Sequence, residues 1–198
     1  PEVICRLMTD RKPLPGKLAF SRDLFVLLFL LRGMPFVDLA FLRRCDLQGN
    51  VITYHRRKTS RKLTVVVGKE AMEIIQKYMY TIPDSPYLFP IIQNPGKDEY
   101  GQYARMLRLQ NYRLTQVANI LGIRDRLSTY TARHTWATTA LRQNYNSSLI
   151  CDAMGHSSVK VTETYFQPYR DDEVNRMNSS LITYILSKKK RGTDKKIR

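Results

Sequence analysis

Clustered cysteine and histidine residues are absent from this sequence. The cysteines Cys5, Cys45 and Cys151 lie far apart without a Cys-x-x-Cys pair, and the histidines stand singly at positions 55, 134 and 156. These spacings argue against a zinc site and against a fold held by disulfides. Isolated cysteines, odd in number, fit an intracellular, reducing compartment. We therefore predict neither a bound metal nor a cofactor.

Long apolar segments are also absent. The most apolar run covers the eight residues 24–31, between Asp23 and Arg32. A membrane-spanning helix needs roughly 20 apolar residues, so no membrane partner is predicted. No signal peptide is recognisable. Because the chain begins with Pro1-Glu2-Val3 rather than with Met, we expect it to be a fragment of a longer protein.

Positive charge is what the sequence has in excess. Its 33 Lys and Arg residues against 17 Asp and Glu residues give a net charge of +16. Residues 188–198 hold seven basic residues and one acidic residue, a net +6, which leaves +10 of the total on the rest of the chain. Charge outside the tail favours a polyanionic partner. Nucleic acid fits better than a membrane surface, because no aromatic residues interrupt the basic run.

Hydrophobic periodicity predicts an α+β fold that is mainly α-helical. The helices are expected at residues 2–8, 18–31, 37–42, 69–80, 100–121, 128–144, 147–154, 157–165 and 171–186. Their expected N-caps include Ser128 or Thr129, Ser147 or Ser148, and Ser157. β-Branched runs and turns predict a small three-stranded antiparallel sheet from segments 43–47, 51–54 and 63–67. One domain, residues 1–187, is expected before a disordered basic tail at 188–198.

Residues 131–165 contain the side chains that a phosphodiester reaction needs. Metal-free cleavage requires a nucleophile, cations that stabilise the non-bridging oxygens, and an acid for the leaving oxygen. Arginine binds phosphate through its planar fork, and tyrosine can form a covalent intermediate. Arg133, His156 and Tyr165 occur in this order, and the sequence has no acidic cluster suited to metal binding. The sequence therefore favours a covalent, metal-free route.

Three short motifs resemble the signature of the tyrosine recombinases of the phage integrase family. They are Arg133-His134-Thr135, Met154-Gly155-His156 and Thr162-Glu163-Thr164-Tyr165. The family pattern is His-x-x-Arg-His, then Leu-Gly-His, then a tyrosine nine residues later. The order of predicted helices, sheet and trailing helix extends the resemblance over nearly all 198 residues. It implies a catalytic-domain fold and a site-specific recombinase or integrase that cleaves and rejoins DNA through a covalent 3′-phosphotyrosine.

The resemblance implies roles for individual residues. Tyr165 matches the nucleophile, and Arg133 matches the second catalytic arginine. His156 matches the position that hydrogen-bonds the scissile phosphate. Lys58, at the tip of the second hairpin, matches the general acid for the leaving 5′-oxygen. Its basic neighbours Arg57, Arg61 and Lys62 leave that assignment open. Together with Arg56 they are expected to bind DNA.

Two positions depart from the family pattern. Tyr130 stands where the family has its first histidine, and Pro35 stands where it has its first catalytic arginine. Arg32 lies about one helical turn before Pro35, so we expect it to reach the same phosphate; the alternative is a cation that only neutralises a helix end. Asp38 matches the acidic residue that supports the site. These departures resemble Bacteroidetes-type mobile-element integrases and leave open a weak or inactive enzyme.

The resemblance also implies an assembly. The family exchanges strands as four protomers on double-stranded DNA, so we expect a homo-tetramer on DNA and a monomer as the free fragment. The helix at 171–187 is expected to dock on a neighbouring protomer, with packing on its own domain as the alternative. We expect the family's N-terminal core-binding domain to be absent from this fragment. The implied location is the bacterial cytoplasm, in association with the nucleoid.

Two other functions fit parts of the sequence. Residues 114–123 resemble the first helix and turn of a helix-turn-helix module, with residues 128–133 opening a recognition helix. Arg133 would then contact DNA in a non-enzymatic regulator, a reading that accounts for the charge but not for His156, Tyr165 or the basic hairpin. A type IB-like topoisomerase shares the covalent chemistry but does not need the trailing helix.

Overall fold

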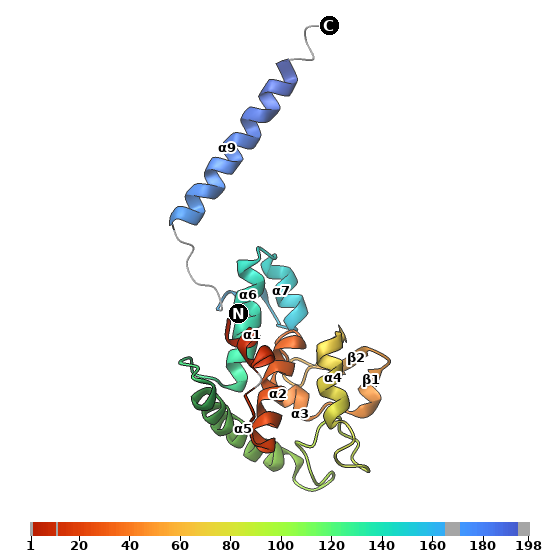
Figure 1. Cartoon of the computed structure of the whole chain (residues 1–198). Helices are drawn as coiled ribbons and strands as arrows, with labels where there is room; N and C mark the ends of the chain where they lie inside the picture. Colours follow the sequence, from red (N-terminus) through yellow and green to blue (C-terminus); the bar gives the residue numbers. More distant parts are fainter. Residues whose placement is uncertain (1, 11, 165–170, 194–198) are drawn as a thin grey trace. The chain divides into compact units, whose positions relative to one another are not determined.

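A computed structural model describes residues 2–10, 12–164 and 171–193. The chain divides into two compact units, one ending at Tyr165 and one beginning at Phe166. Helices make up most of the described residues, and a small antiparallel sheet completes the first unit (Figure 1). The predicted mainly helical α+β fold is therefore confirmed.

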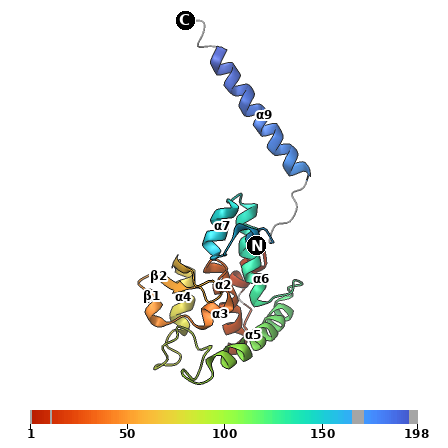
Figure 2. The ribbon, with the colours of Figure 1, turned by 180° about the vertical axis from the view of Figure 1, so that it is seen from behind.

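Helix α2 (Gly16–Leu30) is the centre of the first unit. Its residues 24–28 are all buried, because this segment is apolar on every side rather than on one face. The helices that contact it include α1 (Glu2–Thr9), α4 (Lys69–Tyr78), α5 (Glu99–Leu121) and α6 (Thr129–Arg142). Figures 1 and 2 show α2 in the middle of the unit, with α5 at one end and α6 and α7 (Ser147–Met154) at the other. The predicted buried helix at 18–31 is confirmed.

The sheet lies next to this helical core. Its antiparallel strands run in the order β1 (Leu47–Gln48), β2 (Val51–His55) and β3 (Lys62–Val66). The prediction of a first strand at 43–47 is wrong for most of that segment, because residues 44–46 form a short 3-10 helix, η1 (Arg44–Asp46). The Asp46 carboxylate accepts a hydrogen bond from the Arg43 N–H at 2.8 Å, which closes this turn and delays the strand.

The connection between α2 and α3 (Phe36–Ala40) is a turn, not a helical extension. Arg32 and Gly33 have φ angles of 60° and 66°, in the left-handed region. The Met34 N–H donates to the Leu28 carbonyl at 3.0 Å, which closes the end of α2. The predicted helices at 37–42 and 69–80 are present but shorter, since they end at Ala40 and Tyr78.

Local caps fix the ends of α6 and α7. Ser128 accepts from the backbone of the first turn of α6, as predicted. Helix α7 is capped by Asn146 rather than by Ser147 or Ser148, because the Asn146 side chain accepts the Ser148 N–H at 2.7 Å. Gly155 ends α7 in a left-handed conformation, with a φ angle of 63°, as predicted.

The described part of the second unit is α9 (Asp171–Thr193). It continues beyond the predicted helix end at residue 186 and includes the first residues of the predicted tail; residues 194–198 lie outside the described residues. Large apolar side chains are exposed on it at Met177, Leu181, Ile182 and Tyr184. Across the described part of the chain, no helix combines the length and the apolar content needed to cross a membrane.

Candidate active site

Arg133 lies on α6 and is only 4 % exposed. Its Nη1 donates to the Gly33 carbonyl at 2.5 Å, in the turn that follows α2. Its Nη2 donates to the Met154 carbonyl at 3.0 Å, at the end of α7, and to His156 Nε2 at 2.7 Å. Arg133 therefore joins three segments that lie far apart in the sequence, and its guanidinium is oriented by the fold.

His156 follows the left-handed Gly155 and is 4 % exposed. An arginine has only N–H donors, so Nε2 of His156 accepts the hydrogen bond from Arg133. The ring proton is then on Nδ1 and is donated to Thr162 Oγ1 at 2.7 Å. Burial, together with the positive charges of Arg133, Arg56 and Lys58, lowers the pKa of His156 to about 4. His156 is therefore neutral at pH 7.

Thr162 is the partner that fixes this ring from the other side. It lies in α8 (Val159–Glu163), which begins after Ser158, one residue later than the predicted cap Ser157. Thr162 is completely buried, and its hydroxyl accepts the His156 Nδ1–H. Helix α8 is thus tied to the turn that carries His156 through the hydrogen bond between Thr162 and His156.

Arg56 lies at the end of β2, on the same face as the buried Ile52 and Tyr54. Its Nη1 donates to the carbonyls of Met154 at 2.7 Å and Gly155 at 2.5 Å. Arg56 is 6 % exposed, so the prediction that it contacts DNA does not fit its position. Its guanidinium instead satisfies carbonyls at the C-terminal end of α7.

The other basic residues of the β2–β3 hairpin are exposed. Lys58 stands in the turn between the strands, as predicted. Arg57 covers the ring of Phe41 at 3.8 Å from the centroid. Arg61 Nη2 forms an ion pair with Asp152 at 3.0 Å, and its Nη1 donates to the His156 carbonyl at 3.4 Å. The hairpin therefore packs against the turn that carries His156.

Arg32 is brought to the same region by its turn. The prediction placed it one helical turn before Pro35, but the residues between α2 and α3 are not helical. Its Nη1 donates to the Thr64 carbonyl of β3 at 3.2 Å, and it is half-buried. The neighbouring Gly33 contacts Arg133 closely, because a β-carbon at Gly33 would lie 3.1 Å from Arg133 Cα. Arg32 thus lies beside the Arg133 segment for a reason other than helical spacing.

Asp38 provides a buried carboxylate next to these cations. It is 3 % exposed, and its Oδ1 accepts the Arg57 N–H at 3.0 Å. Burial raises the pKa of Asp38, although the Arg57 hydrogen bond and the charges of Arg56 and Arg133 act in the opposite direction. Within the described residues, Asp38 Oδ2 has no hydrogen-bond partner.

Two tyrosines, Tyr130 and Tyr165, belong to the predicted site. Tyr130 lies in the first turn of α6, is 60 % exposed, and stacks on His134 with ring centroids 6.4 Å apart. Tyr165 lies outside the described residues. The described site therefore consists of Arg133, His156, the hairpin and the Arg32 turn.

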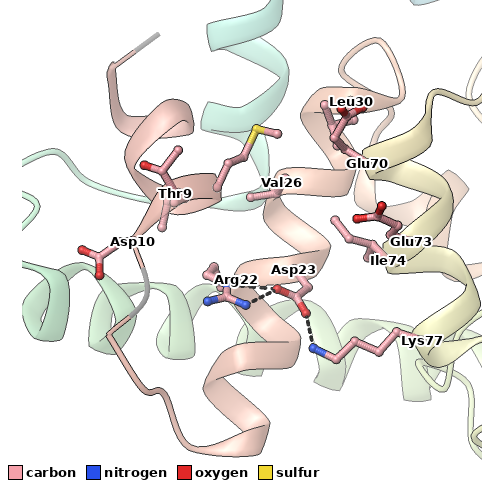
Figure 3. A pocket seen from close by; sticks show the side chains of 12 residues that line it. Thr9, Asp10, Arg22, Asp23, Val26, Leu30, Glu70, Glu73, Ile74 and Lys77 are labelled. Carbon is pink, nitrogen blue, oxygen red and sulfur yellow. Dashed lines mark hydrogen bonds and ion pairs between the residues drawn. The ribbon is translucent and has the colours of Figure 1, made fainter.

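A separate cavity of about 660 Å³ lies among α1, α2 and α4 (Figure 3). Asp23 lines it and binds Arg22 and Lys77, as the dashed lines show. None of the described residues that line this cavity is a predicted site residue. Among the described residues there is also no group of three or more histidine, cysteine, aspartate or glutamate side chains that could hold a metal ion.

Sequence reasoning missed the positions of Arg56 and Thr162 in the site. A signal for Arg56 was present, because the alternation of β2 puts it on the face of Ile52 and Tyr54. For Thr162 no comparable signal exists, since its contact with His156 depends on how α8 is placed.

The chain matches the model of the phage integrase family over residues 1–171. The tyrosine recombinase XerC of Thermodesulfovibrio yellowstonii is 26 % identical over 167 residues, which cover 77 % of this chain and 52 % of that protein. A tyrosine recombinase of Pseudothermotoga lettingae is 32 % identical over 60 residues, which cover 30 % of this chain and 21 % of that protein. The chain thus spans about half the length of the XerC relative.

Solved structures with the same fold include recombinases and integrases. XerA recombinase matches with a TM-score of 0.64 at 19 % identity, over 90 % of this chain and 61 % of that one. The Tn1549 transposon integrase in complex with transposon right end DNA matches with a TM-score of 0.66 at 15 % identity, over 92 % and 65 %. The XerH recombinase bound to its difH substrate matches with a TM-score of 0.61 at 16 % identity, over 90 % and 52 %.

Proposed function

The chain belongs to the phage integrase family, and from this premise we propose that it is the catalytic domain of a site-specific DNA recombinase. The domain, residues 1–187, cleaves and rejoins strands through a covalent 3′-phosphotyrosine. The observation that carries the proposal is the buried pair of Arg133 and His156, joined at 2.7 Å. A guanidinium fixed by the fold next to a neutral imidazole suits a phosphodiester.

The reaction follows from these groups. The hydroxyl oxygen of Tyr165 attacks phosphorus and loses its proton, while the bond from phosphorus to the 5′-oxygen breaks. Arg133, with Arg32, stabilises the charge on the non-bridging oxygens, and His156 completes their hydrogen bonding. Lys58 donates a proton to the leaving 5′-oxygen. A 5′-hydroxyl reverses these steps, and no ATP is needed because one phosphodiester replaces another.

Tyr130 stands at the position where the family has its first histidine, a residue that could act as a base. Its phenol can donate and accept a hydrogen bond, but a neutral phenol is a weak base at pH 7. Removal of the Tyr165 proton therefore receives less help than a histidine would give. The proposal is a recombinase whose first step is slow, not one with a different chemistry.

Double-stranded DNA is the proposed substrate. The net charge of +16 supports it, and so do the exposed cations of the β2–β3 hairpin. The hairpin residues proposed to contact the backbone are Arg57, Lys58, Arg61 and Lys62. DNA-bound structures among the relatives with this fold are consistent with the same substrate.

We also propose that four copies assemble on DNA. The apolar side chains exposed on α9 support a helix that docks on another protomer. They include Met177 and Leu181, four residues apart, and Tyr184, three residues further along, as in a helix that buries one face.

A non-enzymatic regulator is disfavoured by the position of Arg133. That alternative needs Arg133 at the start of a recognition helix, in contact with DNA. Arg133 is instead 4 % exposed, and its guanidinium binds the carbonyls of Gly33 and Met154.

Covalent trapping tests the proposal. A nicked suicide DNA substrate should accumulate a protein–DNA adduct with the wild type and with Tyr145→Phe, a control that changes an exposed tyrosine elsewhere in the chain. Tyr165→Phe should form none, because it lacks the nucleophilic oxygen. An undiminished adduct with Tyr165→Phe would refute the nucleophile. Binding of one duplex site without any adduct would favour a regulator, and relaxation of supercoils at arbitrary sequences would favour a topoisomerase.

A further inference from the structure

We propose that Arg56 is a positioning residue, which clamps the Gly155 turn onto the β2–β3 hairpin and so fixes His156 relative to Lys58. Nothing in the signature motifs identifies Arg56, because it lies outside all three of them. The effect on DNA cleavage rests on the proposed function; the effect on His156 does not.

The clamp is built on two consecutive carbonyls. Arg56 Nη1 donates to Met154 O at 2.7 Å and to Gly155 O at 2.5 Å. These groups end α7, where backbone carbonyls have no partner within the helix. On the helix side, the His156 N–H donates to Cys151 O at 3.0 Å. The turn is therefore held from α7 on one side and from β2 on the other.

Two arginines meet on the same carbonyl. Met154 O also accepts Arg133 Nη2 at 3.0 Å, and Arg133 in turn binds His156 Nε2. Loss of Arg56 removes one of the two charged donors from Met154 O and the strongest contact to Gly155 O. The position of the His156 ring, which depends on this turn, then rests on Arg133 and Thr162.

Other hairpin residues reinforce the contact but reach it less closely. Thr59 Oγ1 donates to Gly155 O at 3.3 Å, and Arg61 Nη1 donates to His156 O at 3.4 Å. Lys58 stands between Arg56 and Thr59 in the same hairpin. The segment that carries the proposed general acid is therefore fastened directly to the segment that carries a proposed phosphate ligand, and Arg56 makes the buried part of that connection.

Because Arg56 is buried, another residue cannot fully replace it at this position. It is 6 % exposed, and within the described residues its Nε has no hydrogen-bond partner. The nearby carboxylate of Asp38 is the counter-charge, and Asp38 also accepts the N–H of Arg57. A lysine supplies the charge without the planar fork, so it should restore only part of the clamp.

Arg44 offers a matched control. Like Arg56, it donates to two backbone carbonyls, those of Ile82 and Pro83, and its Nε is also buried without a partner among the described residues. Arg44→Met therefore removes the same kind of contact from a connection outside the site. Arg56→Met and Arg56→Lys complete the set.

Two measurements test the clamp. Single-turnover adduct formation at saturating protein should fall on the order of 10²-fold in Arg56→Met, the loss that a misplacement of about 1 Å causes, with partial recovery in Arg56→Lys and little change in Arg44→Met. NMR titration of the imidazole signals should show the pKa of His156 rising above about 4 in Arg56→Met and staying unchanged in Arg44→Met.

The outcomes separate the clamp from the proposed function. Adduct formation by Arg56→Met at the rate of Arg44→Met would overturn the clamp, and so would an unchanged pKa of His156. If the wild type forms no adduct, the proposed function fails, while the titration still decides the clamp. If Arg56→Met does not fold, adduct formation and the His156 titration are both measured on Arg56→Lys. Wild-type behaviour of Arg56→Lys in both measurements would overturn the need for a planar fork.

Discussion

Glycine at position 155 is required by packing as well as by backbone conformation, and a second glycine separates the two effects. Gly122 ends α5 and Gly155 ends α7 with the same φ angle of 63° and ψ angles of 34° and 38°. Both should therefore oppose a β-carbon equally through the left-handed backbone. Their surroundings differ, and Gly155→Ala should cost more stability than Gly122→Ala.

The difference follows from what each methyl group meets. At Gly122 the nearest atom is the end of the flexible Arg6 side chain at 3.7 Å, so only the left-handed cost of about 1–2 kcal/mol applies. At Gly155 the methyl group would lie 2.7 Å from Leu63 Cδ1 and 3.2 Å from Arg56 Cδ. Overpacking of this kind adds about 1–3 kcal/mol. The expected losses are therefore about 1–2 kcal/mol for Gly122→Ala and about 2–5 kcal/mol for Gly155→Ala.

Urea unfolding followed by the fluorescence of Trp136, the single tryptophan, measures both losses. Equal shifts of the midpoint with unchanged slopes would refute the packing argument, because the backbone cost is common to the two sites. Gly155→Ala should also slow adduct formation, since its methyl group pushes against Arg56 and moves the turn before His156. Gly122→Ala should leave adduct formation unchanged.

Two further predictions concern charged groups. Burial opposes the charge of Asp23, but hydrogen bonds from Lys77, Tyr78 and Arg22 leave its pKa below the ordinary 3.8. Asp23→Asn should thus lose about 1–3 kcal/mol at pH 7, and its deficit against the wild type, measured by urea unfolding, should vanish as the pH falls through the lowered pKa. Arg32→Ala should reduce adduct formation on the order of 10²-fold with nearly unchanged DNA affinity; wild-type cleavage would mean that another cation serves.

Where local interactions decide a structure, the sequence predicted it well. The apolar run at 24–28 has no polar face, so a buried helix was the simplest outcome, and α2 has that role. Gly155 as a helix end and Ser128 as a helix start could be predicted from the backbone conformation and hydrogen bonds of their own turns. The prediction of the first strand was wrong for a local reason as well. The Asp46 side chain closes a 3-10 turn, which no hydrophobic pattern reveals.

The site was predictable only in part, because most of its contacts join distant segments. Motif spacing identified Arg133 and His156, and the fold brings their side chains to 2.7 Å. Helical spacing predicted that Arg32 reaches the site. In the structure a left-handed turn brings Arg32 to the site, and its side chain donates a hydrogen bond to a carbonyl of β3. Arg56 contacts carbonyls about 100 residues further along, a distance at which no spacing rule applies.

The absence of an arginine at position 35 does not leave the site without positive charge. Among the described residues, the charged side chains that act on the buried hydroxyl of Tyr54 include Asp38, Arg133, Arg56 and Arg32. One carboxylate against three guanidinium groups leaves an excess of positive charge, and burial makes an unbalanced charge costly.

In the proposed reaction a phosphodiester anion would reduce that excess, so binding of DNA would remove part of the cost in the free protein. Burial, followed by the charges of Arg133, Arg56 and Lys58, keeps His156 neutral by lowering its pKa, which leaves its ring able to share hydrogen bonds with Arg133 and with Thr162. Arg133 and Arg56 therefore contribute both to the positive charge of the site and, after burial, to the neutrality of the imidazole.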